Sequence, residues 1–406
     1  MAADRLDGLD LIRGVAVLGI LAINLGGFAG PIAGSLSPHL PAPGSLADEA
    51  WFTVGLVLFE GKMRALFTLL FGASLLLFLD RAEARGEDGE RLQLRRLGWL
   101  AACGYLHFLL LWWGDILFTY ALAGFAALAL RQARPGPLLI AGVTLFAAWH
   151  LAMGLAGLPQ VRAEQRVLAG AAGPAETTAY RTQRAEDAAA TARELAGYRQ
   201  GFAAQVARRL RDQPGEPLRA AFATLGESLP LMLIGMALFR SGLYAGQWSP
   251  RLLRAVALGG LGAGGLLTAA FAAWAWRAHF PPVLMVQALA YHLALPHLLM
   301  GLGYCALLVR IGPWLAGTRL GRRLTAAGRM AFSNYLGMTL VMTFVFYGWG
   351  LGLVGRVPEH WLWPFLLGGW GLMLGWSAPW LARFRHGPLE WLWRCLTYGE
   401  WLPLRR

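Results

Sequence analysis

Two ionisable side chains at the end of one apolar stretch are the strongest candidates for chemistry in this chain. His107 lies within the apolar stretch 97–113, and Asp115 follows directly after Gly114. A neutral imidazole between buried helices can accept and return a proton near neutral pH, so we expect His107 to be a general base that Asp115 orients. The alternatives are a satisfied core histidine and an aspartate that only caps the next helix. Eight helical residues would place His107 about 12 Å deeper than Asp115.

Polar groups of two other stretches join this candidate site. Asn24 lies well inside the apolar stretch 11–29, where its amide either donates to a developing oxyanion or holds helices together. Lys62, the single lysine, lies with Arg64 at the start of the stretch 63–79 and is predicted to hold a substrate, unless it reaches lipid headgroups. An ionisable group within a span costs about 2.5–3.5 kcal/mol, so each needs a reason. We therefore expect one water-poor chamber, open to the outer side, to gather Asn24, Lys62, His107 and Asp115.

Metal and disulfide chemistry is not indicated. The three cysteines, Cys103, Cys305 and Cys395, have neither a zinc spacing nor the number that a disulfide framework needs. His292 and His297 are five residues apart with a proline between them, which misses the four-residue spacing of a helical metal pair. We predict no metal site and no tightly bound cofactor.

The elements that must position these groups are membrane helices. Of the 406 residues, 57% are hydrophobic and 15% are charged, which argues against a soluble core. A helix needs about 17–25 apolar residues to cross a bilayer, and ten stretches approach this length. They fall at about 11–29, 63–79, 97–113, 116–130, 137–157, 223–239, 255–276, 285–309, 330–350 and 363–382. The predicted fold is all-α, a polytopic membrane bundle of about ten transmembrane helices.

The arginines indicate how this bundle is oriented. Segments on one side of the ten predicted spans carry most of the arginines, whereas the short loops on the other side carry few. By the positive-inside rule, both termini are predicted to be cytoplasmic. These clusters account for the formal net charge of +13, so no nucleic-acid partner is expected. A cleaved signal peptide is the alternative for the first stretch, but Asp10 and Arg13 at its start favour a retained span.

The chain divides into three predicted parts. Residues 1–157 form an N-terminal membrane domain of five spans with the polar cluster, residues 158–222 an extracytoplasmic loop, and residues 223–406 a C-terminal membrane domain of five spans with an interfacial tail. One helical face of the loop would carry Leu195, Tyr198, Phe202, Val206 and Leu210. This pattern predicts an amphipathic helix, either a lid over the spans or a helix that rests on the bilayer.

Four groups of residues, spread over nearly the whole chain, together resemble a known family. The first contains Arg5, Leu6, Asp7, residues 9–16, Gly19, Ile20 and Asn24. The second contains Gly61, Lys62, Leu66, Phe67, Leu70, Phe71 and Gly72, and the third contains His107, Gly114, Asp115, Ile116, Leu117 and Tyr120. The last contains residues 328–331, Asn334, Tyr335, Gly387, Pro388, residues 390–394, Leu396 and Thr397. In this order they resemble the YeiB-like family of bacterial inner-membrane proteins, which has a C-terminal domain of unknown function.

This resemblance implies a multi-pass protein of the bacterial cytoplasmic membrane that contacts membrane lipids. Within the matching groups, Tyr120, Asn334 and Tyr335 are the candidates for holding a substrate together with Lys62 and Arg64. The family has no established reaction, and the sequence makes no prediction of the oligomeric state.

The Leu-Asp-x-x-Arg-Gly opening is also distantly similar to that of transmembrane acyltransferases, including the acyltransferase-three group and heparan glucosaminide acetyltransferases. This similarity implies transfer of an acyl group from cytoplasmic acyl-CoA, as donor substrate, to a lipid or glycan acceptor at the outer face. The phosphates of CoA would then meet Arg13, Arg95, Arg96, Arg322, Arg323 and Arg329, unless these arginines only fix the orientation of the spans. Because Asn24 stands where the acyltransferase-three group has a histidine, catalysis here would depend on His107.

Two other classes of function use the same residues. A transporter or lipid flippase would need a recessed polar cluster at mid-depth and would move its substrate without covalent change. A non-catalytic membrane module would need the polar residues only to hold its helices together.

Overall fold

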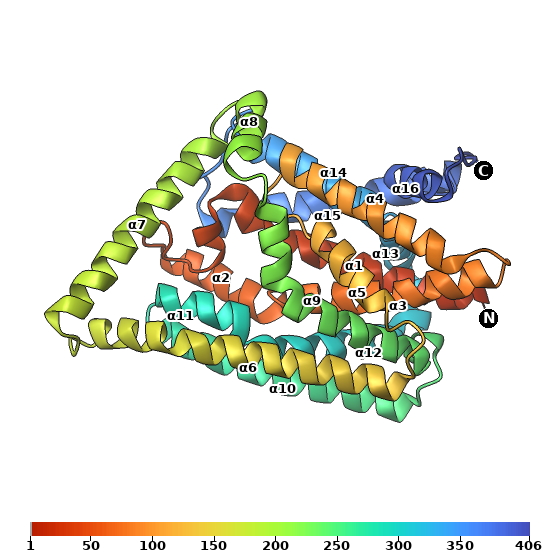
Figure 1. The fold of residues 1–406 in the computed structure, drawn as a ribbon, viewed down its shortest axis with the longest axis horizontal. Coiled ribbons are helices and arrows are strands. Elements are labelled where there is room, and N and C mark those ends of the chain that lie inside the picture. The colour runs from red at the N-terminus through yellow and green to blue at the C-terminus, as the bar shows by residue number, and fades with distance from the viewer. Residues whose placement is uncertain (1) are drawn as a thin grey trace.

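The computed structural model of this chain is built from helices (Figure 1). It describes the backbone of residues 2–406 and the side chains of residues 8–406. The side chains of Arg5, Leu6 and Asp7, which belong to the first family group, therefore lie outside the described residues. Over the described chain no strand is found, and a single isolated bridge joins Phe384 to Arg405.

The helices follow one another along the chain with short connections. The first half comprises α1 (Ala2–Ala29), α2 (Leu46–Leu58), α3 (Lys62–Glu83), α4 (Gly89–Leu110), α5 (Leu117–Leu128), α6 (Pro135–Leu168), α7 (Pro174–Tyr198) and α8 (Phe202–Asp212). The second half comprises α9 (Glu216–Arg240), α10 (Pro250–Arg277), α11 (Pro282–Gln287), α12 (Ala294–Ala316), α13 (Arg319–Arg329), α14 (Ala331–Phe346), α15 (Trp363–Arg383) and α16 (Pro388–Tyr398).

Six helical segments are long and apolar enough to cross a membrane. They are α1 from Gly8 onward, the α2–α3 pair, α6, α9, α10 and α12. The other four predicted spans fall on α4, α5, α14 and α15. Of these, α5 and α14 are apolar but have only 12 and 16 residues, while α4 begins with several charged residues. The all-helical, membrane-like character predicted from the composition is confirmed, whereas helix length and composition do not establish ten crossings.

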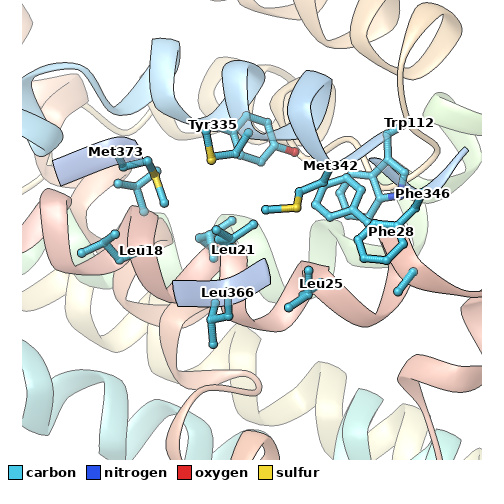
Figure 2. Packing of buried hydrophobic residues seen from close by; sticks show 14 of the residues in the cluster. Leu18, Leu21, Leu25, Phe28, Trp112, Tyr335, Met342, Phe346, Leu366 and Met373 are labelled. Carbon is cyan, nitrogen blue, oxygen red and sulfur yellow. The ribbon is translucent and has the colours of Figure 1, made fainter. Parts of the chain in front are cut away.

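Helix α1 lies at the centre of the half of the molecule that contains both termini. Its apolar residues surround the helix, and Leu18, Leu21, Leu25 and Phe28, at spacings of three and four residues, form one face. Figure 2 shows this face packed against α14 and α15, through Leu18, Leu21, Leu25, Phe28, Tyr335, Met342, Phe346, Leu366 and Met373. In lipid such interfaces are held by close packing, because the hydrocarbon is as apolar as the side chains.

Two glycines bring α1 against α13. A methyl group on Gly14 would overlap the carbonyl of Leu324, and one on Gly328 would overlap the carbonyl of Asp10. Both glycines belong to the family groups identified in the sequence, and this contact gives the physical reason for their type. It also brings Arg329, at the end of α13, next to the first turns of α1.

The predicted loop 158–222 differs from expectation in two respects. Helix α6 continues to Leu168, where Glu164 caps α11 by accepting from the backbone N–H groups of Val283 (2.9 Å) and Leu284 (2.8 Å). The single amphipathic helix is wrong, because α7 ends at Tyr198 and α8 begins only at Phe202.

The break between α7 and α8 has a visible tertiary cause. The ring of Tyr198 is buried and stacked on Tyr347 at 4.7 Å, and its carbonyl accepts from the N–H of Gly348. Of the predicted apolar face, Phe202 and Leu210 are instead 43% and 50% exposed. The buried face of α8 is formed by polar side chains, Gln205 and Arg209.

Candidate functional site

His107 and Asp115 form a buried pair where α4 ends and α5 begins. Nδ1 of His107 lies 2.8 Å from Oδ1 of Asp115, and the two side chains are 0% and 3% exposed. The other carboxylate oxygen accepts from the N–H of Phe118 at 2.8 Å, so Asp115 also caps α5 as expected. The predicted 12 Å difference in depth is wrong, because residues 111–116 fold back toward α4 instead of extending its axis.

A glycine makes this fold-back geometrically feasible. A methyl group on Gly104 would overlap the backbone N of Phe118 and would lie 2.8 Å from Oδ2 of Asp115. The start of α5 can therefore approach the last turns of α4 closely. The side chain of His107 is thus fixed by its own helix and by the carboxylate of the next one.

The hydrogen bond defines which nitrogen of His107 is available. A carboxylate accepts, so in a neutral imidazole the proton is on Nδ1 and the lone pair is on Nε2. Nε2 is buried and has no hydrogen-bond partner. The ring of Tyr335 lies 5.3 Å from that of His107, and its hydroxyl donates to the carbonyl of Gly114 at 3.4 Å. An unpaired buried nitrogen is uncommon, and Nε2 of His297 is another in this chain.

A cavity of about 550 Å³, here called the basic vestibule, is lined by the first turns of α1 and by α16, and these two helices contain the ends of the chain at one side of the bundle in Figure 1. Among the described residues, seven arginines and two acids, Asp10 and Glu390, line it. The arginines are Arg13, Arg81, Arg85, Arg96, Arg329, Arg385 and Arg394. Burial, followed by the arginines around it, lowers the pKa of His386 in this wall to about 4. The vestibule is therefore strongly cationic at neutral pH even though its histidine is uncharged.

A second, mostly apolar cavity of about 190 Å³ continues from the vestibule into the bundle. The two cavities share six wall residues, Arg13, Ser74, Arg96, Arg329, Glu390 and Trp393. Its deeper wall includes Ile116, Tyr120 and Tyr335. Because Tyr335 also contacts His107, the apolar cavity ends beside the buried pair.

Two helices connect the vestibule to this depth along single faces. On α4, Arg96, Leu100, Gly104 and His107 follow at spacings of four, four and three residues, which is one helical face. On α1, Arg13, Val17, Ile20 and Asn24 follow a matching pattern. On α4, His107 lies eleven positions beyond Arg96, which is about 16 Å along the helix axis. On α1, Asn24 lies the same number of positions beyond Arg13.

A third cavity, here called the α7–α8 cavity, lies on the other side of Asp115. It has a volume of about 670 Å³ and is walled by α7, α8, the start of α9 and the turn that contains Trp113, Gly114 and Asp115. Arg209 of α8 connects this wall to the pair, since it donates to the carbonyls of Leu109 (3.1 Å) and Leu111 (3.2 Å) in the last turn of α4.

The predicted donor-binding arginines largely come together. Arg13, Arg96 and Arg329 all line both the vestibule and the apolar cavity. Arg96 lies over the rings of Phe78 and Trp393, and Arg13 is paired with Asp10 at 2.5 Å. Arg95 does not join them, because its guanidinium donates to the carbonyl of Leu396.

The chamber expected to gather four polar groups is not formed as predicted. Lys62 is fully buried, but Nζ donates to the carbonyl of Leu56 at 2.5 Å across the break between α2 and α3. Lys62 lines none of the three cavities. Arg64 is likewise engaged, with Glu227 at 3.1 Å. Both residues have structural contacts here. Lys62 bonds a carbonyl that the helix break leaves free, and Glu227 compensates the charge of the Arg64 guanidinium.

The remaining predicted residues divide between the cavities and the helix interfaces. Asn24 and Tyr335 line a gap of only about 10 Å³, which neither His107 nor Asp115 lines. Tyr120 lines the apolar cavity and shares a 2.5 Å hydrogen bond with Thr68. The amide of Asn334 is fully used by Ala327, Ser377 and Trp376, which makes it a helix-packing group.

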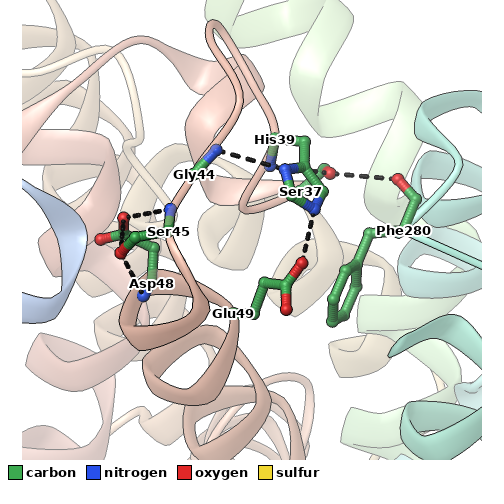
Figure 3. A network of polar contacts seen from close by, with 7 residues as sticks. All are labelled: Ser37, His39, Gly44, Ser45, Asp48, Glu49 and Phe280. Carbon is green, nitrogen blue, oxygen red and sulfur yellow. Dashed lines mark hydrogen bonds and ion pairs between the residues drawn. The ribbon is translucent and has the colours of Figure 1, made fainter. Parts of the chain in front are cut away.

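A separate polar cluster surrounds the start of α2 (Figure 3). Nε2 of His39 lies 2.8 Å from Glu49, and its Nδ1 accepts from the N–H of Gly44 at 3.2 Å. His39, Glu49 and His279 offer three ligand atoms within 4.8 Å of one another. However, a histidine whose Nδ1 accepts carries its proton on Nε2, which is then a donor to Glu49 and not a metal ligand. The cluster acts as a clamp on the loop before α2.

The sequence interpretation missed several residues of the cavities. Arg81, Arg385 and Arg394 come from different segments and were counted only as charges on one side of the membrane. Arg208 and Arg209 of α8 fell in a loop for which only an apolar face was considered. Clustering of arginines was visible in the sequence, but their meeting in one cavity depends on tertiary contacts between α1, α3, α13 and α16.

Comparisons with known proteins agree on relatives whose function is not described. Residues 238–400 match a family model described as a protein of unknown function (DUF418). The chain is 34% identical over 397 residues to the uncharacterised protein YeiB of Escherichia coli (strain K12), covering 96% of this chain and 95% of that protein. It is 29% identical over 424 residues to the uncharacterised protein YxaH of Bacillus subtilis (strain 168), covering 99% and 96%. No solved structure matches.

Proposed function

We propose that this chain, which belongs to the YeiB-like family of bacterial proteins, is an integral-membrane acyltransferase that moves an acyl group from cytoplasmic acyl-CoA to an acceptor at the outer face. The observation that carries this proposal is the position of the His107–Asp115 pair. It lies between the vestibule and apolar cavity on one side and the α7–α8 cavity on the other.

The first two cavities fit the two chemically different halves of an acyl-CoA. A nucleotide with several phosphates needs a cationic, open site, and planar guanidiniums such as Arg96 and Arg329 suit phosphate oxygens. The pantetheine arm and the acyl chain need a narrower, mostly apolar path, as the second cavity provides. The distance of about 16 Å along α4 from Arg96 to His107 is comparable with the length of an extended pantetheine arm.

The chemistry follows from the lone pair on Nε2 of His107. This nitrogen would take the proton of an acceptor hydroxyl or amine as the acceptor oxygen or nitrogen forms a bond to the thioester carbonyl carbon. Asp115 would stabilise the resulting imidazolium through Nδ1. Collapse of the tetrahedral intermediate breaks the carbon–sulfur bond, and the imidazolium returns its proton to the leaving thiolate. The products are the acylated acceptor and CoA.

Two residues would complete this step. Tyr335 contacts His107 and lines the apolar cavity, so its side chain must turn aside for the thioester to reach Nε2. The amide of Asn24 borders the same gap and would donate to the oxyanion once Tyr335 has moved.

Topology follows from the same proposal. The vestibule gathers arginines from the segments that the positive-inside rule assigns to the cytoplasm. We therefore place both termini in the cytoplasm, the protein in the bacterial inner membrane with about ten crossings, and a lipid or glycan acceptor at the outer face.

The test is release of CoA thiol by the purified protein in nanodiscs made from bacterial lipid extract. Acyl-CoA substrates from two to sixteen carbons are supplied, and His107→Gln is compared with His292→Gln, a histidine that lines none of the three cavities. We expect thiol release by the wild type and by His292→Gln, and a loss of at least 100-fold in His107→Gln. Absence of both binding and thiol release for every chain length would refute the proposal.

A transporter is the second candidate, and the broken helix pair α2–α3 is the observation that favours it. Gly61 has a positive φ of 71° at the break, and discontinuous helices often surround transport sites. A transporter would move its substrate without releasing CoA thiol. Flux without acylation would decide in its favour.

A further inference from the structure

In the walls of the α7–α8 cavity, the acidic side chains have partners within the protein, whereas two of the arginines have no ion pair. Its acids, apart from Asp115, are Glu194, Asp212 and Glu216. Glu194 accepts from the hydroxyl of Tyr198 at 2.6 Å and from the N–H of Ile32 at 3.2 Å. The carboxylate of Glu194 therefore already has hydrogen-bond partners within the protein.

The two remaining acids are neutralised by arginines of their own segments. Asp212 pairs with Arg211 at 2.9 Å, and Glu216 pairs with Arg219 at 2.6 Å. Asp212 and Glu216 therefore each have a counter-charge, and Glu194 is held by a hydroxyl and a backbone N–H. A cationic ligand would have to compete with ion pairs that already exist.

Three arginines line the same walls; Arg209 donates to backbone carbonyls of α4, and the other two form no ion pair among the described residues. Arg193 of α7 and Arg208 of α8 both line the cavity, and neither forms an ion pair. The guanidinium of Arg208 is held against Gly197 and over the ring of Tyr198, 5.9 Å from its centroid. Its Nε is buried without a hydrogen-bond partner.

A second buried donor without a partner lies next to the His107–Asp115 pair. Nε1 of Trp113 is buried without a partner, and Trp113 lines the cavity two residues before Asp115. Unpaired buried donors are rare in folded proteins because each forfeits a hydrogen bond. Here two buried donors without acceptors, Nε of Arg208 and Nε1 of Trp113, belong to the walls of one cavity large enough for a small ligand, and the exposed Arg193 adds a further positive charge.

We propose that the α7–α8 cavity is the acceptor site and that it selects an acceptor carrying a phosphate group. Arg193 and Arg208 hold the phosphate, Trp113 donates to it or to an adjacent oxygen, and a hydroxyl of the same molecule reaches the His107–Asp115 pair. This inference rests on the proposed function for the direction of transfer. A phospholipid headgroup and a soluble polyol phosphate share this chemistry.

The experiment measures equilibrium binding without any acyl-CoA, so that it does not depend on turnover. The soluble probe is glycerol 3-phosphate, with glycerol as the neutral control. The lipid probe is phosphatidylglycerol in nanodiscs, compared with phosphatidylcholine alone. Thermal stabilisation and affinity are recorded at low and high NaCl, because a charge interaction weakens with salt.

Two matched pairs of variants locate the effect. Arg193→Gln with Arg208→Gln removes the charges of the proposed site. Arg162→Gln with Arg181→Gln removes two exposed charges from α6 and α7 outside the cavity. A third pair, Arg96→Gln with Arg329→Gln, removes charges from the vestibule and the apolar cavity and shows whether the probe binds there instead.

We expect a phosphate-bearing probe to bind, the Arg193/Arg208 pair to weaken it at least tenfold, and the other two pairs to leave it within twofold. A response to the lipid alone or to glycerol 3-phosphate alone identifies the source. Equal binding of glycerol, or an unchanged affinity in the Arg193/Arg208 pair, overturns the inference. If phosphate binds as predicted while no acyl-CoA is consumed, the proposed function fails and the anion site remains.

Discussion

Replacing Asp115 with asparagine separates the two hydrogen bonds that its carboxylate makes. The amide oxygen of asparagine can still accept from the N–H of Phe118, which now lies 2.8 Å from Oδ2, so the cap of α5 is kept. The amide nitrogen, however, can only donate to Nδ1 of His107, which lies 2.8 Å from Oδ1. The proton of the imidazole then moves to Nε2, and this nitrogen no longer has a lone pair.

The expected magnitudes follow from this change of tautomer. Loss of general-base catalysis lowers the rate of acyl transfer by about 10²–10⁴-fold. The free energy of unfolding changes by less than about 1 kcal/mol, because an acceptor for the helix end remains. CoA thiol release and the thermal midpoint of the Asp115→Asn protein are measured in the same nanodiscs. Activity within threefold of wild type, or a fall in activity that parallels a large fall in midpoint, would refute the reasoning.

Three further predictions concern the vestibule and the loop near η4 (Glu359–Trp361). Arg96→Gln should weaken acyl-CoA binding by about 5–30-fold. Arg96→Lys should restore part of this binding, because lysine keeps the charge without the planar contacts. Titration with labelled acyl-CoA tests both variants. Burial, followed by the nearby charge of Asp48, raises the pKa of Glu359 to about 8. The free energy of unfolding should therefore fall as pH rises from about 4.5 to 8. In Glu359→Gln, the melting midpoint should no longer decrease over this pH range. The pKa of His386 is lowered to about 4, so stability should fall as pH decreases from about 6.5 to 4; an unchanged acid slope in His386→Gln would contradict this.

Helix positions were the part of the fold most accessible from the sequence. All ten predicted apolar stretches fall on helices, because apolar length is a local property. The helix α2 was missed, since its 13 residues are fewer than a membrane span needs and Asp48 and Glu49 occupy its first turn. The break between α7 and α8 was also missed, because it depends on the stacking of Tyr198 on Tyr347, about 150 residues away.

The sequence predicted which residues form the candidate site better than it predicted how they are arranged. His107 and Asp115 were identified because charged groups beside an apolar stretch are costly, but their direct contact requires the fold-back at residues 111–116. Lys62 met the same criterion of cost and proved to be structural, because a break in the backbone gave it the carbonyl of Leu56. Burial cost identifies residues that need a partner, while only tertiary structure shows whether that partner belongs to the protein.

The most direct test of the central claim is a measurement of sidedness in sealed proteoliposomes. Acyl-CoA with a radiolabelled acyl group is supplied only on the side of the vestibule, and label is followed in acceptors on the opposite side. Orientation is established beforehand by protease access to the α7–α8 segment. We predict label on the far side with wild type and none above background with His107→Gln of equal thermal midpoint. Far-side label that is undiminished in His107→Gln, or no labelling by the folded wild type in bacterial lipid, would contradict a pair that works between two cavities.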